Sequence, residues 1–211
     1  MNSNDWLSKI DCLNFSNKTV LIIGGGYMAI EYLKASKKLN IKNIIIISNE
    51  GHQIQDYCDD DKIKLLKGGF MKCLKEIQKS DLVIIACPQL LTIDALNEVL
   101  KYNHQNILVE KPGSLHHTEL SSIGKKYHKR KIKVAYNRSA YPSLHKLKML
   151  VKKEGGITSC KFTFTEWLDR IDFKKDPKEV YDYWGISNSL HVISMAFDII
   201  GMPKKMNVMQ S

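Results

Sequence analysis

A glycine-rich turn is the part of this sequence best suited to chemistry. The apolar run Val20–Ile23 ends at Gly24, and the spacing Gly24-x-Gly26-x-x-Ala29 leads into an amphipathic segment. In a dinucleotide-binding turn, the first glycine permits the tight turn, the second lets the backbone approach a pyrophosphate, and the small third residue lets helix and strand pack closely. Unpaired N–H groups at the helix start favour phosphate. The pattern also fits a tight strand–helix turn that binds nothing.

A lysine follows a later strand. Glu110-Lys111-Pro112 comes directly after the apolar run 107–109. In a doubly wound sheet, ligands bind at the carboxyl ends of the strands. Lys111 can therefore reach a bound nicotinamide or a substrate hydroxyl, and the proline stiffens the turn. An ordinary surface turn would have the same composition.

Tyr136-Asn137-Arg138 stands at the end of the next predicted strand, 132–136. It lies on the same ligand edge and also where the chain leaves the alternating pattern. Arg138 can hold an anionic or hydroxyl-rich ligand. A salt bridge at a domain junction explains the arginine equally well.

A histidine stands near the start of a late helix, in the segment Trp184–His191 (WGISNSLH). Serine and asparagine surround it, and an imidazole titrates near neutral pH, so His191 can give or take a proton in a reaction. A structural histidine on a helix is the competing interpretation.

The elements that position these residues alternate between strand and helix up to about residue 136. Strands are predicted at residues 19–23, 44–47, 63–66, 82–86, 107–109 and 132–136, and helices at 27–39, 70–79, 90–101 and 118–128. Continuous apolar strands suit a sheet covered by helices on both faces. We therefore predict an α/β fold with a doubly wound parallel sheet, a Rossmann dinucleotide-binding domain over residues 1–138.

The pattern changes after Arg138. We expect a helix at 142–152, an alternating strand at 157–167, a polar loop at 169–178, a helix at 188–200 and the start of another strand at 205–209. These elements predict a partial α+β substrate and oligomerisation domain over residues 139–211. A two-stranded sheet with one apolar face is marginal alone.

Composition and charge limit the function classes. The net charge is +10, but lysines are scattered and only residues 125–133 form a dense basic run, which suits a solvated helix end better than nucleic-acid binding. The five cysteines form no CxxC pair, so we expect free thiols and no metal site. No run approaches ~18 apolar residues and the first residues lack an apolar signal region. We expect a cytoplasmic protein without membrane or nucleic-acid partners.

Together these motifs resemble the Gfo/Idh/MocA (glucose-fructose oxidoreductase / inositol dehydrogenase) family over nearly the whole chain. The order and spacing that carry the resemblance are Gly24-x-Gly26-x-x-Ala29, Ala86-Cys87-Pro88, Glu110-Lys111-Pro112, Tyr136-Asn137-Arg138 and the helix with His191. The resemblance implies NAD or NADP as cofactor and a sugar, polyol or nucleotide sugar as substrate. It implies that Lys111 touches nicotinamide and substrate and that His191 faces the reacting hydroxyl.

The site residues expected on this basis fall into three sets. Those expected to be catalytic are Lys111 and His191. Those expected at the cofactor are Gly24, Gly26, Tyr27, Met28, Ser48, Asn49, Cys87, Pro88, Glu110 and Lys111. Those expected at the substrate are Tyr136, Asn137, Arg138, Trp184 and Asn188.

The chain departs from the family pattern in places. Ser187 stands where the family often carries an aspartate, four residues before the histidine, so proton transfer would fall on His191 and Lys111. Ser48-Asn49-Glu50 follows the second strand in place of an early acidic residue, which leaves NAD and NADP both open. The chain is also shorter than usual family members.

We therefore predict an NAD(P)-dependent oxidoreductase that moves a hydride between nicotinamide and a secondary alcohol of a sugar or nucleotide sugar. The sequence around His191, together with Tyr141-Pro142-Ser143, looks most like a branch of the family found with surface-polysaccharide sugar biosynthesis. A homo-oligomer formed through the C-terminal sheet is expected from the resemblance. The alternative is a catalytically inactive dinucleotide-binding protein with a regulatory or scaffold role.

Overall fold

The computed structural model of this protein describes residues 13–59, 61–77, 79–205 and 207. Their contacts divide the chain into two compact units, the first ending at Ala135 and the second beginning at Tyr136. The first unit holds every strand found in the described residues, whereas the described part of the second consists of helices and connecting segments.

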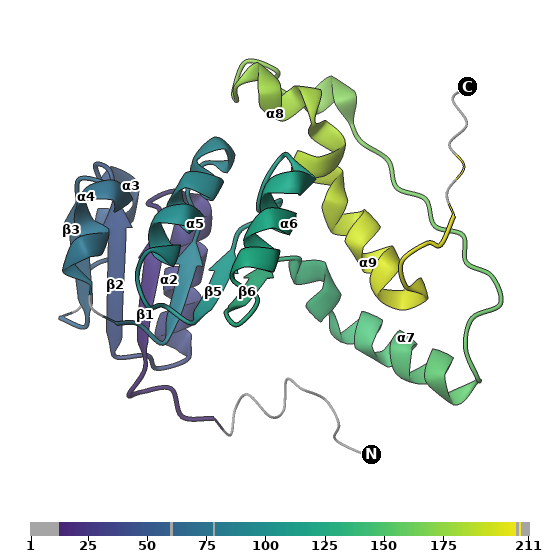
Figure 1. The fold of residues 1–211 in the computed structure, drawn as a ribbon, viewed down its shortest axis with the longest axis horizontal. Coiled ribbons are helices and arrows are strands. Elements are labelled where there is room, and N and C mark those ends of the chain that lie inside the picture. The colour runs from purple at the N-terminus through teal and green to yellow at the C-terminus, as the bar shows by residue number, and fades with distance from the viewer. Residues whose placement is uncertain (1–12, 60, 78, 206, 208–211) are drawn as a thin grey trace. The chain divides into compact units, whose positions relative to one another are not determined.

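The first unit is built on one parallel sheet. Its six strands are β1 (Thr19–Ile23), β2 (Asn43–Ser48), β3 (Ile63–Lys67), β4 (Leu82–Ile85), β5 (Asn106–Val109) and β6 (Lys131–Val134). They lie in the order β3-β2-β1-β4-β5-β6 (Figure 1). The direction of winding reverses beside β1, so the crevice at the carboxyl end of β1 is the expected ligand position of this topology. The predicted doubly wound α/β fold is confirmed.

Helices cover both faces of the sheet because the strands are apolar on both sides. Val20 and Ile22 of β1 pack with α2 (Tyr27–Lys38), through Ala29 and Leu33 among others. The alternate residues Leu21 and Ile23 point to the other face. That face is covered by α4 (Phe70–Cys73), η1 (Leu74–Glu76), α5 (Thr92–Leu100) and α6 (His117–Lys126). The short elements α3 (His52–Gln55) and η2 (Gln89–Leu91) complete the unit.

Helix ends differ from the predicted ones where local backbone changes. The helix predicted at 70–79 ends at Glu76, because Ile77 takes an extended conformation with φ −102° and ψ 100°. The helix predicted at 118–128 spans His117–Lys126, and Tyr127 leaves the helical region with φ −113° and ψ 35°. The apolar positions Leu74 and Ile77 are buried as predicted, with exposed fractions of 0% and 5%.

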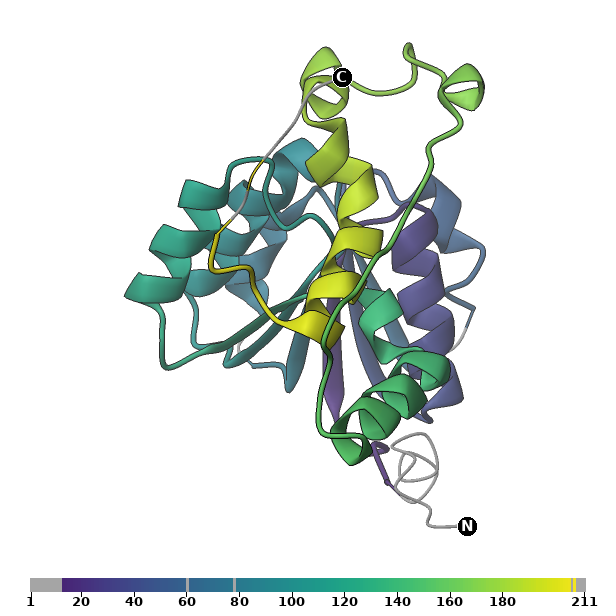
Figure 2. The same cartoon turned by 90° about the vertical axis from the view of Figure 1, so that its right-hand side faces the viewer.

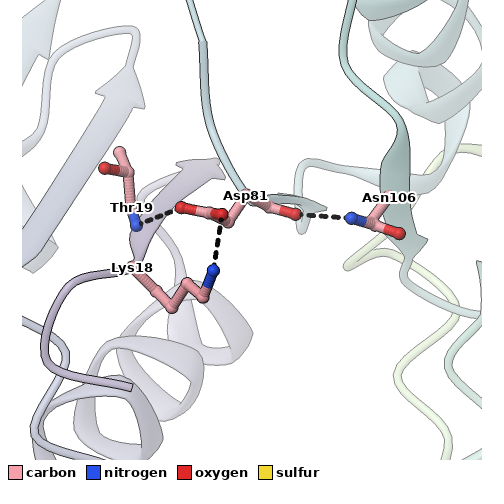
Figure 3. A network of polar contacts seen from close by, with 4 residues as sticks. All are labelled: Lys18, Thr19, Asp81 and Asn106. Atoms are coloured by element: carbon pink, nitrogen blue, oxygen red, sulfur yellow. Dashed lines mark hydrogen bonds and ion pairs between the residues drawn. The ribbon is translucent and has the colours of Figure 1, made fainter. Parts of the chain in front are cut away.

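Asp81 joins the amino ends of three strands (Figure 3). The backbone N–H of Thr19 donates to its carboxylate at 2.9 Å, and Lys18 Nζ lies 3.2 Å from the other oxygen. Asn106 Nδ2 donates to the Asp81 carbonyl at 2.8 Å. The hydrogen bond from Thr19, followed by Lys18, holds the pKa of Asp81 below its usual value. This network therefore stabilises the ionised carboxylate in the folded state.

The second unit is helical in its described part. It contains η3 (Asn137–Ala140), α7 (Pro142–Lys153), η4 (Leu168–Arg170), α8 (Lys178–Asp182), the π-helical turn η5 (Gly185–Ser189) and α9 (Leu190–Ile200). The predicted helix at 142–152 is confirmed within one residue. The predicted helix at 188–200 is confirmed from Leu190, with its first residues in the π-helical turn.

The strand predicted at 157–167 is wrong. Figures 1 and 2 show this segment as a trace without helix or strand that follows α7. Phe162 and Phe164 of the alternating pattern are 44% and 38% exposed. A strand needs a neighbour for its backbone groups, and the described residues from 136 onward offer none. The further strand predicted at 205–209 lies mostly outside the described residues.

Candidate functional site

The glycine turn leaves β1 through a backbone path that side chains would block. Gly24 has φ +137°, and a Cβ atom there would overlap the carbonyl of Ala86. A Cβ atom at Gly25 would overlap the Ser48 hydroxyl. The turn is held by Gly24 N–H, which donates to the Ile47 carbonyl at 2.8 Å. Glycine is therefore required because the turn lies tightly against the neighbouring strand ends.

Helix α2 begins immediately after this turn without a side-chain cap. Gly26 is the N-cap, and the first turn contains no acidic residue. The first N–H groups of the helix are therefore presented together with the positive end of its dipole. Tyr27 and Met28 stand at these first positions with side chains 73% and 37% exposed. Their expected contribution to cofactor binding is therefore that of their backbone N–H groups.

A pocket of about 570 Å³ opens in front of the glycine turn. Six of the ten residues expected at the cofactor line it: Gly24, Gly26, Ser48, Asn49, Cys87 and Pro88. They come from the ends of β1, β2 and β4, which the parallel register places side by side: Ile23 pairs with both Ile47 and Ile85. The pocket accordingly lies at the topological switch point.

Sequence reasoning missed a second wall of this pocket. The loop after β3 and the start of α4 contribute Gly68, Gly69, Phe70 and Met71, and α3 contributes His52 and Gln53. Gly68 and Gly69 have φ +114° and +78°. The Gly-Gly pair between a strand and a helix was a visible signal for this loop.

The carboxyl end of β2 and the residues after it line the pocket with two uncharged side chains and one carboxylate. The Ser48 side chain is buried against Gly25, and Asn49 Oδ1 faces Gly69. Glu50 also lines the pocket, but its carboxylate lies 3.3 Å from His52 Nε2, and both side chains are more than three-quarters exposed. Ser48 and Asn49 therefore offer a ribose no carboxylate, and the carboxylate of Glu50 is exposed beside His52.

Cys87 and Pro88 form the wall that follows β4. Burial raises the pKa of the Cys87 thiol to about 11, so the thiol is protonated at neutral pH. Cys87 therefore contributes a neutral, apolar surface to the pocket and is a poor nucleophile.

The turn that carries Lys111 is tied to α2. Tyr32 Oη donates a hydrogen bond of 2.5 Å to Glu110 Oε1, and the Lys111 N–H lies 3.2 Å from Glu110 Oε2. Burial, then the hydrogen bond to Glu110, raises the pKa of Tyr32 far above its usual value. Glu110 also anchors the turn through its backbone, because its N–H donates to Ile85 and its carbonyl accepts from Gly113. Glu110 therefore holds the turn, and Lys111 follows it at the carboxyl end of β5.

In the second unit, the structure brings two expected residues together. The rings of Tyr136 and His191 meet edge to face, with centroids 6.5 Å apart and an interplanar angle of 86°. Burial raises the pKa of Tyr136. Asn137 and Arg138 belong to the adjoining turn η3, and Asn137 is exposed.

Trp184 directly precedes the π-helical turn η5, and Asn188 lies within it. Trp184 stacks on Tyr181 with ring centroids 5.7 Å apart, and no hydrogen-bond acceptor among the described residues meets its buried Nε1. Asn188 Nδ2 donates to the carboxylate of Glu166. Ser187 is buried, and its hydroxyl donates to the Val180 carbonyl at 2.9 Å. Ser187 therefore has a structural bond, whereas Asn188 is oriented by a residue that sequence reasoning did not single out.

This arrangement can bind a dinucleotide in the first unit. The glycine turn and the start of α2 suit a pyrophosphate, and the flanking pocket has room for the rest of a nucleotide. Within the described ranges, no group of three or more His, Cys, Asp or Glu residues could hold a metal ion. No helix of the described chain is both long and apolar enough to cross a membrane.

Comparison with known sequences places this geometry in a family. The family model described as "Oxidoreductase family, NAD-binding Rossmann fold" (Gfo/Idh/MocA) matches residues 18–138. No curated protein sequence matches the chain significantly.

Solved structures share the fold at low identity. The WlbA (WbpB) dehydrogenase from Thermus thermophilus, solved with NAD and UDP-GlcNAcA, is 17% identical with a TM-score of 0.64, over 87% of this chain and 63% of its own. An oxidoreductase from Thermotoga maritima is 19% identical with a TM-score of 0.67, over 87% and 60%. Biliverdin reductase from Synechocystis sp. PCC 6803, solved with biliverdin and NADP+, is 15% identical with a TM-score of 0.63, over 89% and 59%. This chain thus spans about three-fifths of the length of these structures.

Proposed function

This chain belongs to the Gfo/Idh/MocA oxidoreductase family with an NAD-binding Rossmann fold, and we propose that it transfers a hydride between the nicotinamide of NAD or NADP and a secondary alcohol of a sugar or nucleotide sugar. The observation that carries the proposal is the glycine turn Gly24–Gly26, which faces a pocket of about 570 Å³ in front of the uncapped α2. The backbone path requires glycine at Gly24 and Gly25, and the same turn leaves N–H groups for phosphates.

The chain's own residues would bind, orient and move protons. The bound nicotinamide supplies or accepts the hydride. Lys111 would position and polarise the substrate oxygen, and His191 would exchange its proton, because an imidazole suits reversible proton transfer near neutral pH. Tyr136, Asn137, Arg138, Trp184 and Asn188 would contact the sugar. The UDP-GlcNAcA bound by the Thermus thermophilus dehydrogenase supports a nucleotide sugar as the substrate class. A place in surface-polysaccharide biosynthesis rests on the sequence around His191 alone.

A catalytically inactive dinucleotide-binding protein is the competing function. It is favoured by Ser187, which stands at the position where the family often carries an aspartate and whose hydroxyl is committed to the Val180 carbonyl. This protein would bind the cofactor and turn over no sugar.

Calorimetric titration with NADH and then NADPH, followed by turnover assays with UDP-GlcNAcA and myo-inositol, tests the proposal. Binding with turnover supports the oxidoreductase, and binding without turnover supports the inactive protein. A folded sample that binds neither nucleotide would rule out both functions.

His191→Ala tests the proton-transfer role. We expect turnover to fall by about 100-fold or more while the Kd for NADH changes less than about twofold, since the histidine would act on the substrate. His117→Ala, at an exposed histidine of α6, is the matched control and should leave both unchanged. Equal losses of turnover and NADH affinity would indicate a structural histidine.

A further inference from the structure

Glu166 connects two distant parts of the second unit. It lies in the extended segment before η4, yet its carboxylate accepts hydrogen bonds from residues that are 22 and 23 positions later. Ser189 Oγ donates to Oε1 at 2.6 Å, and Asn188 Nδ2 lies 3.2 Å from Oε1 and 3.0 Å from Oε2. One carboxylate therefore restrains the side chains of two consecutive residues, and hydrogen bonds to an ionised acceptor are the stronger kind.

These two residues close the π-helical turn Gly185–Ser189. Such turns are rare and occur frequently at functional sites. Helix α9 begins directly afterwards, and His191 is its second residue. Asn188 precedes His191 by three residues, across the junction between the π-helical turn and α9, so a restraint on Asn188 acts close to His191 along the chain.

The chemistry of Glu166 determines which way the Asn188 amide faces. An ionised carboxylate only accepts hydrogen bonds, so the NH2 group of Asn188 must face it. The carbonyl oxygen Oδ1, on the opposite branch of the same planar amide, must then face away from Glu166. Asn188 consequently presents an acceptor, rather than a donor, on the side that faces away from Glu166.

We propose that Glu166 is a positioning residue that fixes Asn188 so that its carbonyl oxygen accepts a hydrogen bond from a sugar hydroxyl next to the one on which His191 acts. The inference rests on the proposed sugar oxidoreductase function. It assigns to Glu166 the selection of substrates that carry a hydroxyl donor at this point. Substrates with only an acceptor there would be disfavoured, because two acceptors would face each other.

Glu166→Gln tests the orientation of the amide while keeping the shape of the side chain. Ser189 Oγ can donate or accept, so the new amide has two possible arrangements. It either accepts from Ser189 and donates to Asn188, which turns that amide over, or donates to Ser189 and accepts from Asn188 through one neutral oxygen, and both arrangements weaken the restraint on Asn188. We expect kcat/KM for UDP-GlcNAcA to fall by about tenfold, the size of one lost hydrogen bond, with the loss mainly in KM. Glu154→Gln, at an exposed carboxylate after α7, is the matched control and should retain wild-type kcat/KM.

A second substitution should rescue the first. In Glu166→Gln with Asn188→Asp, one aspartate oxygen accepts from the glutamine amide and the other again presents an acceptor. We expect kcat/KM to return to within about threefold of the wild-type value. A wild-type kcat/KM in Glu166→Gln, or a double variant no better than the single one, overturns the inference.

Hydrogen exchange of the Asn188 side-chain amide, followed by NMR without substrate, separates this inference from the proposed function. The amide hydrogens should exchange at least about tenfold faster in Glu166→Gln than in the wild type or in Glu154→Gln. If this difference is present but the wild type turns over no sugar, the proposed function fails while the restraint by Glu166 stands. Equal exchange in all three proteins overturns the inference whatever the turnover.

Discussion

The two edges of the parallel sheet use their polar groups in opposite ways. At the amino edge, Asp81 bonds Thr19, Lys18 and Asn106 (Figure 3). Close by, Oγ of the buried Ser80 lies 3.0 Å from Nδ1 of the buried His104. Arg130 donates to the carbonyls of Tyr102 and His104. At the carboxyl edge, the chain instead places glycines, a pocket and the uncapped start of α2.

The difference separates stability from binding within one sheet. Polar groups at the amino edge pair with one another, and their bonds contribute to the free energy of unfolding. At the carboxyl edge, the uncapped helix start presents N–H groups that a ligand can take. Substitutions at the amino edge should therefore lower stability without changing cofactor affinity, and a substitution at Gly26 of the carboxyl edge should do the reverse.

Gly26→Ala should give the largest effect. The backbone at Gly26, with φ −87° and ψ −170°, accepts alanine, and a Cβ atom there would meet only Gln53 Oε1 at 3.9 Å. The added methyl group would obstruct the approach of a pyrophosphate, so we expect the Kd for NADH to rise at least about 100-fold, or ~2.7 kcal/mol. The melting temperature should stay within a few degrees of the wild-type value. Calorimetric titration and thermal unfolding measure the two quantities.

Gly124→Ala is the control for this substitution. Gly124 lies in α6, and a Cβ atom there would meet no atom within 4 Å. The variant should gain about 0.5–1 kcal/mol of stability and bind NADH as the wild type does. An unchanged NADH affinity in Gly26→Ala would contradict the assignment of the glycine turn to the cofactor.

Tyr32→Phe should affect both quantities moderately, because Tyr32 ties α2 to the turn that carries Lys111. Loss of the hydrogen bond to Glu110 should lower the free energy of unfolding by about 1 kcal/mol and kcat/KM by about tenfold. Chemical denaturation and steady-state kinetics with UDP-GlcNAcA check these values. Tyr57→Phe, at a tyrosine that is 40% exposed, should change neither. A loss of stability with unchanged kcat/KM would show that the Tyr32–Glu110 hydrogen bond does not control the position of Lys111.

Asp81→Asn should give the smallest effect, confined to stability. We expect the free energy of unfolding at pH 7 to fall by about 1 kcal/mol. Solvent screens the exposed ion pair with Lys18, and the bond donated by the Thr19 N–H weakens because its acceptor becomes a neutral amide oxygen. The NADH affinity should be unchanged. Asp59→Asn, whose carboxylate is 82% exposed, is the control with an expected change near zero.

The pH dependence of this difference gives a further check. Because folding lowers the pKa of Asp81, its contribution is complete above the ordinary aspartate pKa of about 3.9 and is lost as the pH falls through the lower folded value. The stability difference between wild type and Asp81→Asn should therefore shrink in acid. A stability difference that persists well below that pH would show that it does not arise from the ionised carboxylate of Asp81.

The first unit could be predicted from its sequence because each element carries its own signal. Apolar runs such as 44–47 form buried strands, and the spacing at Gly24 and Gly26 marks the turn in front of α2. The carboxyl ends of parallel strands meet at one edge, so Ser48, Asn49, Cys87 and Pro88 could be placed at the pocket without coordinates.

Other features depend on contacts that no local pattern contains. The alternation at 157–167 is typical of a strand, but strand formation requires a paired neighbour that the described residues do not supply. The predicted homo-oligomer would form through a sheet that contains this strand. Because the strand is not formed, it no longer supports the homo-oligomer, which stays a prediction. The proposed roles of Lys111 and His191 likewise stay predictions.

The amino-acid pattern alone predicted the family, the doubly wound sheet and the edge where the pocket lies, because periodicity and glycine spacing act over a few residues. Tertiary structure alone decided which side chains restrain the candidate site residues. The hydrogen bond from Tyr32 to Glu110 joins residues 78 positions apart in the sequence, and the one from Asn188 to Glu166 joins residues 22 positions apart. Such pairs are selected by how helices and loops pack after the chain has folded, and hydrogen-bond direction then determines which atom each side chain leaves for a ligand.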